Sequence, residues 1–452
     1  MGTSKLNLSS TFSAKPIVEG KIVLRDVQDL KPRSRNPRTH SPKQIEQIAR
    51  SIQRFGFVNP VLVGADGGII AGHGRAEAAK LLGLQQVPTL RVDHLSEAEI
   101  RAYVIADNKL AENAGWDKDL LALELKELSI ELDLEITLTG FETPEIDILL
   151  QPAQEDEEPE IAPVNRDVPP VSRAGDLWLI GEHRLFCGDA LDPTSYRQLL
   201  GEDKAGLVFT DPPYNVPIEG HVSGLGRAAH REFAMASGEM TSQEFEQFLA
   251  QVFRNLAAFS RDGALNYICM DWRHTRELLD AGFAAYTEFK NLCVWAKTNA
   301  GMGSLYRSQH ELVFVFKNGH APHVNNIQLG RHGRNRSNLW TYAGMNSFGK
   351  DRDEELAMHP TVKPVGLVAD AILDASLRGD IILDAFTGSG TTLLAAQKTR
   401  RRGYGIEIDP AYADLTIARL SAAYGLEALL TPGDIPFSEV AASRQPRGAD
   451  HG

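Results

Sequence analysis

The 452-residue chain has few cysteines and no long apolar run. Three cysteines are an odd and sparse number, which argues against a disulfide framework and favours buried, reduced thiols. The longest apolar stretches are far shorter than a membrane-spanning helix requires. The first residues lack the apolar core of a secretion signal, and Leu6 stands where a myristoylation site needs serine or threonine. These absences predict a cytoplasmic protein without a membrane partner.

Basic residues are outnumbered, with 47 Lys and Arg against 60 Asp and Glu and a net charge of −13. This balance argues against indiscriminate coating of nucleic acid, although local charge matters more for a protein that binds a groove. Much of the acidic excess lies at residues 155–160 among several prolines, which predicts an extended, solvated linker over 152–170. From about Thr431 the sequence shows no periodicity, and a mobile tail is expected over 431–452.

Both common phosphate-binding loops are missing. The pattern G-x-x-x-x-G-K-[ST] does not occur, and G-x-G-x-x-G is incomplete because Leu393 occupies the third glycine position after Gly388 and Gly390. These glycines belong to a turn at 385–390, between an expected strand at 380–384 and a helix that opens at Thr391. Phosphate is therefore a poor candidate ligand, and an uncharged nucleoside such as that of S-adenosylmethionine fits better. Taken alone, the turn could equally serve strand–helix packing.

A second expected strand, 402–408, carries acidic residues near its end. An acidic side chain about 20 residues beyond a strand, glycine turn and helix is placed to bind ribose hydroxyls. Glu407 lies 23 residues after Asp384, and Asp409 follows it. The spacing predicts that Glu407 binds a ribose.

The tetrapeptide Asp211-Pro212-Pro213-Tyr214 follows an apolar run at 205–210 and should lie at the carboxyl end of a buried strand, where open α/β sheets bind ligands. The exocyclic amino group of a base is a poor nucleophile, because its lone pair is delocalised into the ring. Asp211 can accept one amino hydrogen and the Pro212 carbonyl the other, while Pro213 stiffens the turn. Tyr214 offers a face to a base extracted from its stack. The alternative is a proline-rich turn with a buried aromatic residue.

Residues 175–420 resemble the amino-methyltransferases of DNA, in the class whose catalytic motif precedes its cofactor motif. The resemblance rests on four motifs that occur in the same order as in that class, at 211–214, 359–364, 386–392 and 405–412. It also includes the segment 187–191. It implies a doubly wound, Rossmann-like sheet, the cofactor S-adenosyl-L-methionine and double-stranded DNA as substrate.

The resemblance also implies roles for individual residues. Phe386, Gly388 and Gly390 would line the amino-acid end of the cofactor, Glu407 would hold its ribose, and Asp189 would reach its adenine amino group. Three residues would close the pocket, namely His359, Thr361 and Lys363, although Lys363 could equally be a solvated cation at a helix start. The remaining members of the predicted cofactor set are Asp384, Thr391 and Asp409.

The first catalytic residue bears on the choice of base. The aspartate at position 211 resembles the first motif residue of the adenine enzymes, whereas the cytosine-amino enzymes more often have serine at this position. Methylation of cytosine carbon 5 needs a thiolate nucleophile, usually a cysteine after proline, but Cys187, Cys269 and Cys293 follow Phe, Ile and Leu. The adenine N6 amino group is the predicted target, with cytosine N4 as the alternative. A further alternative is a non-catalytic DNA-binding protein of the family that the first part of the chain resembles, as described below.

The segment between Gly301 and Trp340 is locally basic, because it contains five basic residues and one acidic residue, Glu311. Arginine can bind guanine with two hydrogen bonds. The segment predicts DNA contacts from Arg331, Arg334 and Arg336. A basic loop without a ligand is the alternative.

The first part of the chain has patterns of its own. Apolar residues at helical spacing predict a helix at 43–55, and two short strands, 60–63 and 68–71, flank an Asp66-Gly67 turn. Residues 72–75 open a further helix that runs to Leu82, and Ser96 begins another. Leucine-rich faces at 120–132 predict one or two more helices without an evident helix-turn-helix.

Residues 18–117 resemble the amino-terminal domain of ParB-type partition proteins and sulfiredoxin-like relatives. Partition proteins bind a nucleoside triphosphate through a Gly-Glu-Arg-Arg turn, which is Gly-His-Gly-Arg at 72–75 here, and Asp107-Asn108-Lys109 replaces their second signature. A nucleotide at this domain is therefore left open. His73 and Arg75 either bind phosphate at the helix start or only cap and solvate it.

The sequence thus predicts an α/β protein with a smaller α+β domain at its amino end. The expected parts are a ParB-like domain at 15–117, a helical extension at 118–151, the linker at 152–170, a methyltransferase domain at 171–430 and the tail at 431–452. The first domain is expected to be an accessory. A homodimer is left open.

Overall fold

The computed structural model describes residues 20–131, 136–150, 168–215, 238–298, 305–330, 334–342 and 363–444. Three predicted site residues, Arg331, His359 and Thr361, lie outside these ranges, as does most of the predicted linker. The chain divides into two compact units, Met1–Glu142 and Thr143–Gly452, which are described separately. Among the described residues, no helix combines the length and the apolar character needed to cross a membrane.

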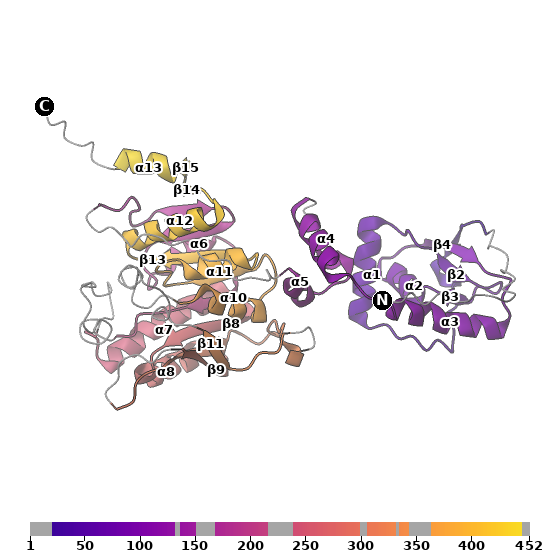
Figure 1. Ribbon diagram of the computed structural model, residues 1–452, viewed down its shortest axis with the longest axis horizontal. Helices are drawn as coiled ribbons and strands as arrows, with labels where there is room; N and C mark the ends of the chain where they lie inside the picture. Colours follow the sequence, from indigo (N-terminus) through magenta and orange to yellow (C-terminus); the bar gives the residue numbers. More distant parts are fainter. Residues whose placement is uncertain are drawn as a thin grey trace, which may run out of the picture. The chain divides into compact units, whose positions relative to one another are not determined.

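The first unit is a small mixed sheet with helices (Figure 1). Its four strands lie in the order β1-β4-β2-β3, with β4 parallel to β2 and antiparallel to β1. The elements are β1 (Val23–Asp26), η1 (Val27–Asp29), α1 (Pro42–Phe55), β2 (Val61–Val63), β3 (Ile69–Ala71), α2 (His73–Leu81), β4 (Gln86–Arg91), α3 (Glu97–Glu112), α4 (Lys118–Glu131) and η2 (Ile136–Thr139). Every helix and strand predicted for this part of the sequence is present.

Local signals in the sequence set the helix boundaries of this unit. The Ser41 side chain caps α1 by accepting a hydrogen bond from the Gln44 N–H, and α1 ends at Gly56 with φ +80°. Ser96 and Glu99 form a reciprocal capping box at the start of α3. Between these helices, buried aliphatic side chains of the sheet and α2 form a compact core.

The second unit is built on an eleven-stranded sheet in the order β11-β9-β10-β8-β7-β12-β13-β6-β5-β14-β15. Its strands are β5 (Leu177–Ile180), β6 (His183–Cys187), β7 (Ala205–Thr210), β8 (Ser260–Met270), β9 (Glu288–Lys297), β10 (His310–Lys317), β11 (Leu339–Tyr342), β12 (Ile381–Asp384), β13 (Arg402–Glu407), β14 (Ala428–Thr431) and β15 (Ile435–Pro436). The five central strands from β8 to β6 are parallel, and antiparallel strands flank them on both sides.

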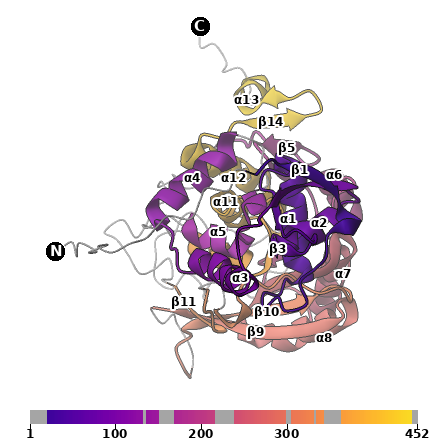
Figure 2. The same ribbon diagram turned by 90° about the vertical axis from the view of Figure 1, so that its right-hand side faces the viewer.

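Helices cover both faces of this sheet, as the doubly wound prediction requires. They are α5 (Thr143–Leu149), α6 (Pro193–Leu200), α7 (Ser242–Phe259), α8 (Thr275–Ala285), α10 (Val365–Ala375), α11 (Thr391–Lys398), α12 (Pro410–Tyr424) and α13 (Phe437–Arg444), with short 3-10 helices η3 (Trp272–His274) and η4 (Gln328–Gly330). In both ribbon views, α13 and β14 lie at one end of the unit and α8 and β9 at the other (Figures 1 and 2).

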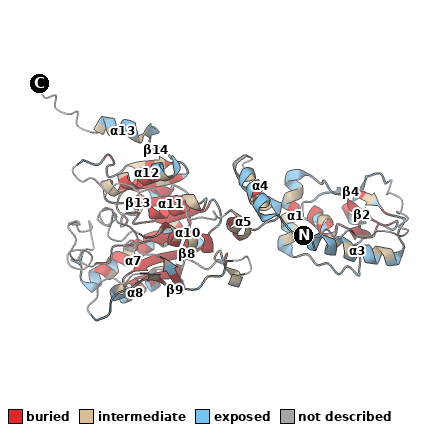
Figure 3. Ribbon diagram, viewed as in Figure 1, coloured by how far each residue is buried: buried red, intermediate tan, exposed pale blue. Residues whose placement is uncertain are grey.

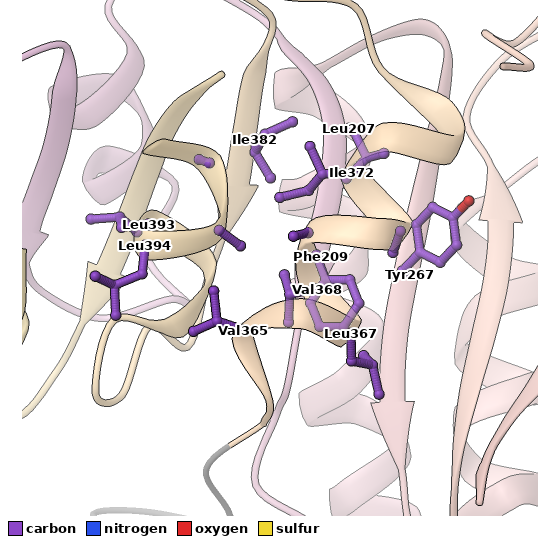
Figure 4. Close-up of a cluster of buried hydrophobic side chains, with 14 of the residues drawn as sticks. Leu207, Phe209, Tyr267, Val365, Leu367, Val368, Ile372, Ile382, Leu393 and Leu394 are labelled. Atoms are coloured by element: carbon purple, nitrogen blue, oxygen red, sulfur yellow. The ribbon is translucent and has the colours of Figure 1, made fainter. Parts of the chain in front are cut away.

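The strands contribute alternate residues to two hydrophobic cores. Along β7, Leu207 and Phe209 pack on the face covered by α10 to α12, whereas Ala205 and Val208 pack on the face covered by α6 to α8. Because both faces are buried, the strand reads as a continuous apolar run, and red ribbon fills this unit in Figure 3. Figure 4 shows α10 side chains such as Val368 and Ile372 against Leu207 and Phe209.

The boundary between the units lies earlier than predicted. Asp147 of α5 is buried and pairs with Arg401 at 2.9 Å and with Arg378 at 2.7 Å, both of which belong to the second unit. The predicted extension at 118–151 is therefore divided, because α5 belongs to the second unit. Sequence spacing cannot reveal a pair of charges more than 200 residues apart.

The prediction of a mobile tail from residue 431 is wrong up to Arg444. This segment forms β15 and α13, and the Phe437 ring packs on Trp178 with a centroid distance of 5.2 Å. Val440 is buried, and Arg444 donates hydrogen bonds to Asp176 and to the Val171 carbonyl. The few apolar residues of this segment pack on the body of the unit, so the order comes from tertiary contacts and not from local periodicity.

Candidate active site

Parallel pairing brings the predicted site residues to one edge of the sheet. β6, β7, β12 and β13 run in the same direction, so Asp189, Asp211, Asp384 and Glu407 all lie at or just beyond their carboxyl ends. β10 runs the opposite way, and its pairing with β8 and β9 places its first residues at the same edge. Open α/β sheets bind their ligands at this edge.

The Asp-Pro-Pro-Tyr turn follows β7 directly, as predicted. The Tyr214 hydroxyl donates a hydrogen bond of 2.6 Å to Asp211 Oδ1, and Lys363 Nζ donates one of 2.6 Å to Asp211 Oδ2. Asn215 ends the turn with φ +52°, and its amide group hydrogen-bonds to backbone atoms of Gly238 and Met240. Both oxygens of the Asp211 carboxylate thus have defined partners, and the turn is anchored at its far side.

Two lysines and two carboxylates form a charge cluster beside this turn, in which Lys363 is buried and Asp211, Lys297 and Glu311 are partly buried. Lys363 Nζ lies 2.9 Å from Glu311 Oε2, and Lys297 Nζ lies 2.5 Å from Glu311 Oε1. Burial raises the pKa of Asp211, and Lys363 opposes this effect. Burial would also raise the pKa of Glu311, but the ammonium groups of Lys363 and Lys297 outweigh it and lower the pKa to about 2. Glu311 is therefore ionised and lies between two ammonium groups.

Asp384 connects the two motifs. It accepts hydrogen bonds from the Thr210 hydroxyl at 2.8 Å and the Thr392 hydroxyl at 2.6 Å, and also from the Phe386 N–H. These bonds join the end of β7, the glycine turn and the first turn of α11. Burial raises the pKa of Asp384 to about 6. In the structure, Asp384 fixes the position of the glycine turn relative to the end of β7.

The glycine turn is shaped by two residues with positive φ. Among the described residues, a Cβ on Gly388, at φ +53°, would have only the Phe386 carbonyl oxygen nearby, at 4.0 Å, so this side of the turn is open in the part of the chain that the structure describes. A Cβ on Gly390, at φ +86°, would lie 2.7 Å from the Thr416 side chain of α12. Gly388 therefore leaves room for a ligand, whereas Gly390 permits close packing of α11 and α12.

Glu407 ends β13 beside this open space. Its carboxylate accepts a 2.7 Å hydrogen bond from the Gly388 N–H and a 2.9 Å bond from the Asp409 N–H. Burial is the main influence on this group and raises the pKa of Glu407 to about 7. The structure thus brings together Glu407 and the glycine turn, as the 23-residue spacing indicates.

The other predicted cofactor residues occupy the same edge. Asp189 accepts a hydrogen bond from the Leu191 N–H, and Asp409 caps α12 through the Ala411 N–H. Phe386 is partly buried, with its ring 6.0 Å from that of Phe248. Thr391 is the first residue of α11 and is buried.

Two of the predicted DNA-binding arginines lie in an internal ion-pair network. Arg334 is 7% exposed and contacts Asp374 at 2.7 Å and Asp370 at 3.2 Å, and Arg336 pairs with the same two carboxylates. Arg336 also lies over the Trp340 ring. Burial argues against a DNA contact for Arg334, and both guanidinium groups stabilise the packing of their segment on α10.

In the first unit, the two side chains predicted to bind phosphate at the turn before α2 contact other parts of the protein. The Arg75 guanidinium folds over Gly72 and donates a hydrogen bond to the Pro60 carbonyl. His73 Nε2 accepts a hydrogen bond from the Arg33 N–H, and burial lowers the pKa of His73. These contacts favour the structural alternative for both residues.

Three family models match the chain. Residues 205–418 match the DNA methylase model of the N6/N4 type, residues 12–108 match the ParB N-terminal domain, and residues 119–174 match the ParB-methyltransferase HTH domain. The chain therefore contains a DNA methylase domain of the N6/N4 type and a ParB-type amino-terminal domain. The HTH match corrects the expectation that no helix-turn-helix follows the first domain. The described helices there are α4, η2 and α5, with 14, 4 and 7 residues.

Relatives exist for each part of this methylase. The ParB-like nuclease domain-containing protein YnaK of Escherichia coli K12 is 46% identical over 79 residues, which is 18% of this chain and 91% of YnaK. The type II methyltransferase M.HpaI of Haemophilus parainfluenzae is 25% identical over 260 residues, 54% of this chain and 76% of M.HpaI. The solved complex of M1.HpyAVI with its cofactor SAM is 20% identical, with a TM-score of 0.38, and covers 52% of this chain and 98% of that one.

Sequence reasoning missed several residues of the site. Glu311 was counted only as a charge that offsets a basic segment, and Lys297 and Asn215 were not singled out. Gly405 was also missed, although a Cβ there would lie 2.3 Å from the Thr387 hydroxyl. The signal for Glu311 was its place at the start of an apolar strand, but only the strand order shows that this strand begins at the ligand edge.

Proposed function

We propose that this methylase transfers the methyl group of S-adenosyl-L-methionine to the N6 amino group of adenine in double-stranded DNA. The observation that carries the proposal is the Asp211 carboxylate, which lies at the end of β7 between the Tyr214 hydroxyl and the Lys363 ammonium. The next strand in the sheet, β12, leads into the glycine turn that would hold the methyl donor. Acceptor and donor sites therefore lie on adjacent strands.

The residues at the glycine turn fit the cofactor. Open space beside Gly388 leaves room for it, and the Glu407 carboxylate stands at the end of the neighbouring strand, where it can accept hydrogen bonds from two ribose hydroxyls. Phe386 offers an aromatic surface next to this turn. Bound there, S-adenosylmethionine supplies an electrophilic methyl group on a sulfonium centre.

The side chains of the turn after β7 would act on the base. Tyr214 offers its ring to a flipped adenine, and Asp211 and the Pro212 carbonyl accept the two amino hydrogens. These contacts draw the nitrogen lone pair out of the ring system and aim it at the methyl group. The new bond forms between nitrogen and carbon while the sulfur–carbon bond breaks, and the electron pair of the broken bond stays on sulfur. The methylated nitrogen then loses one proton to water, so no covalent enzyme intermediate is needed. Correct placement of the reacting atoms supplies most of the rate increase.

A substitution at Asp211 tests this function. We expect Asp211→Ala to keep cofactor affinity within a few-fold and to lower the transfer of tritiated methyl groups to DNA by at least about a hundredfold, the loss typical of a positioned polar group at a reacting centre. Asp280→Asn is the control, because Asp280 is an exposed partner of Arg276 on α8. Retained turnover in Asp211→Ala would exclude this catalytic assignment.

Cytosine N4 is the competing target, because the family includes enzymes for both amino groups. Asp211 favours adenine, since the cytosine-amino enzymes that the motif resembles more often have serine there. The alternative predicts N4-methylcytosine in DNA from cells that express the protein. Detection of modified bases by sequencing separates the two outcomes.

For the first unit, we propose binding of a phosphate-bearing ligand such as a nucleotide. A cavity of about 830 Å³ lies between the segment after η1, the β2–β3 turn and the start of α3. Its lining has five basic residues, Lys31, Arg33, Arg35, Arg91 and Arg101, and three acidic ones, Asp66, Asp93 and Glu97, of which Glu97 pairs with Arg33 and Asp93 with Arg91. Equilibrium dialysis with labelled nucleoside triphosphates tests this proposal, with Arg101→Ala expected to weaken binding. Equal affinity of the variant and the parent would reject the cavity as the site.

A further inference from the structure

Glu311 is a partly buried carboxylate that the proposed chemistry does not yet use. It is the second residue of β10, directly opposite Trp295 of β9, at the edge where Asp211 lies. Its side chain is 14% exposed and contacts the ammonium groups of Lys363 and Lys297 at 2.9 and 2.5 Å. A buried ion pair costs desolvation energy and is weak evidence for stability, so its position beside the reacting group calls for a functional explanation.

Lys363 connects Glu311 to Asp211. Its side chain is 5% exposed, and its ammonium group lies 2.6 Å from Asp211 Oδ2, 2.9 Å from Glu311 Oε2 and 3.2 Å from the Tyr214 hydroxyl. Lysine has a flexible four-carbon stem and three donors. With Asp211 as its only carboxylate partner, the ammonium could shift by rotation of this stem. A second carboxylate, Glu311 on β10, fixes the ammonium at one point.

We propose that Glu311 is a positioning residue for methyl transfer, which anchors Lys363 so that Lys363 holds the Asp211 carboxylate toward the target amino group. This inference rests on the proposed function and deepens it. Reacting groups must be held within a fraction of an ångström by supporting side chains, and a misplacement of about 1 Å can cost about a hundredfold in rate. Glu311 Oε2 also accepts a 3.3 Å hydrogen bond from the Tyr214 hydroxyl, but Glu311 itself touches neither base nor cofactor in this scheme.

The charges around Asp211 give the proposal a distinctive pH signature. Asp211 is faced by Tyr214 of its own turn, Lys363 before α10, Glu311 of β10, Cys269 of β8 and Asp384 of β12. Glu311 is a like charge, so its removal lowers the pKa of Asp211. Lys363 is an opposite charge, so its removal raises that pKa. The acid limb of the transfer rate should therefore move to lower pH in Glu311→Gln and to higher pH in Lys363→Met.

The experiment compares these variants of the full chain in single-turnover transfer of labelled methyl groups. We expect Glu311→Gln to lower the rate by about ten- to a hundredfold while the dissociation constants for S-adenosylmethionine and DNA stay within about threefold of the parent. The double variant should be no slower than Lys363→Met alone, because Glu311 acts through Lys363. Glu288→Gln is the matched control, since Glu288 pairs with Lys290 and Lys317 on the same strands but is 45% exposed.

Three results would overturn the positioning role. These are an unchanged rate in Glu311→Gln, multiplicative losses in the double variant, or acid limbs that do not move in opposite directions. A crystal structure of Glu311→Gln provides a readout without activity, and an Asp211–Lys363 contact identical to that of the parent would also reject the role. Failure of the proposed function looks different, because the parent itself would then transfer no methyl group to DNA, or Asp211→Ala would remain active.

Discussion

The buried pair between Asp147 and Arg401 allows a sharp test of how α5 belongs to the catalytic unit. Arg401 is 1% exposed, and its guanidinium also donates to the Ser376 carbonyl at 2.8 Å and the Thr399 carbonyl at 2.6 Å. In Asp147→Asn the side chain keeps its size but loses its charge. The guanidinium then stays buried with neutral partners alone, and breaking a buried ion pair in this way costs about 3–5 kcal/mol.

Urea unfolding followed by tryptophan fluorescence measures this cost. Four of the five tryptophans, at 178, 272, 295 and 340, lie in the second unit, so the signal reports mainly on that unit. With a slope of about 3 kcal/mol per molar urea, a loss of 3 kcal/mol lowers the midpoint by about 1 M. Asp280→Asn is again the control, because an exposed pair contributes about 0–1 kcal/mol. If Asp147→Asn shifts the midpoint no more than this control, the anchoring of α5 is wrong.

Four further outcomes follow from the site and its surroundings. Gly388→Val should weaken S-adenosylmethionine binding measured by calorimetry, because a branched side chain would fill the open space and would be strained at φ +53°; an unchanged affinity would count against the pocket. Burial raises the pKa of Glu407 to about 7, so cofactor binding that favours the ionised carboxylate should release about half a proton at pH 7 and should weaken as the pH falls. Glu407→Gln should abolish both the proton release and this pH dependence. Equal binding enthalpies in buffers of different ionisation heat would contradict the proton release. Because of the same raised pKa, the folded state binds more protons than the unfolded state between about pH 4.5 and 7, so Glu407 lowers the free energy of unfolding as the pH rises through this range. Glu407→Gln should make the free energy of unfolding less dependent on pH there. Arg334→Ala should lower the urea midpoint and leave the salt dependence of DNA binding unchanged, since Arg334 is buried against Asp374; a shallower salt slope with normal stability would restore the DNA contact.

Much of the fold could be predicted from local patterns in the sequence. Apolar run, turn and helix signals placed β7, β12, α11 and β13 correctly, because each strand of a doubly wound sheet is a short apolar run followed by a distinctive turn. The same signals placed the hairpin and helices of the first unit. Parallel strands align their carboxyl ends, so placing Asp211 and Glu407 at one edge needed only the order of motifs along the chain.

Long-range contacts were beyond the reach of these patterns. Glu311 and Lys363 lie far apart in sequence from Asp211, and their meeting depends on β10 running antiparallel to β8. Arg334 and Arg336 looked like a DNA-binding cluster because their partners, Asp370 and Asp374, lie more than 30 residues away on α10. The order of the segment after residue 431 likewise depends on Trp178 and Asp176. In each case, the deciding interaction joins residues that no local window contains.

The identity of the methylated base is the most direct test of the central claim. DNA incubated with the full chain and deuterated S-adenosylmethionine is digested to nucleosides and analysed by mass spectrometry. The account predicts deuterated N6-methyladenine, which disappears in Asp211→Ala. Deuterated N4-methylcytosine without N6-methyladenine, or no labelled nucleoside from any DNA, would contradict it.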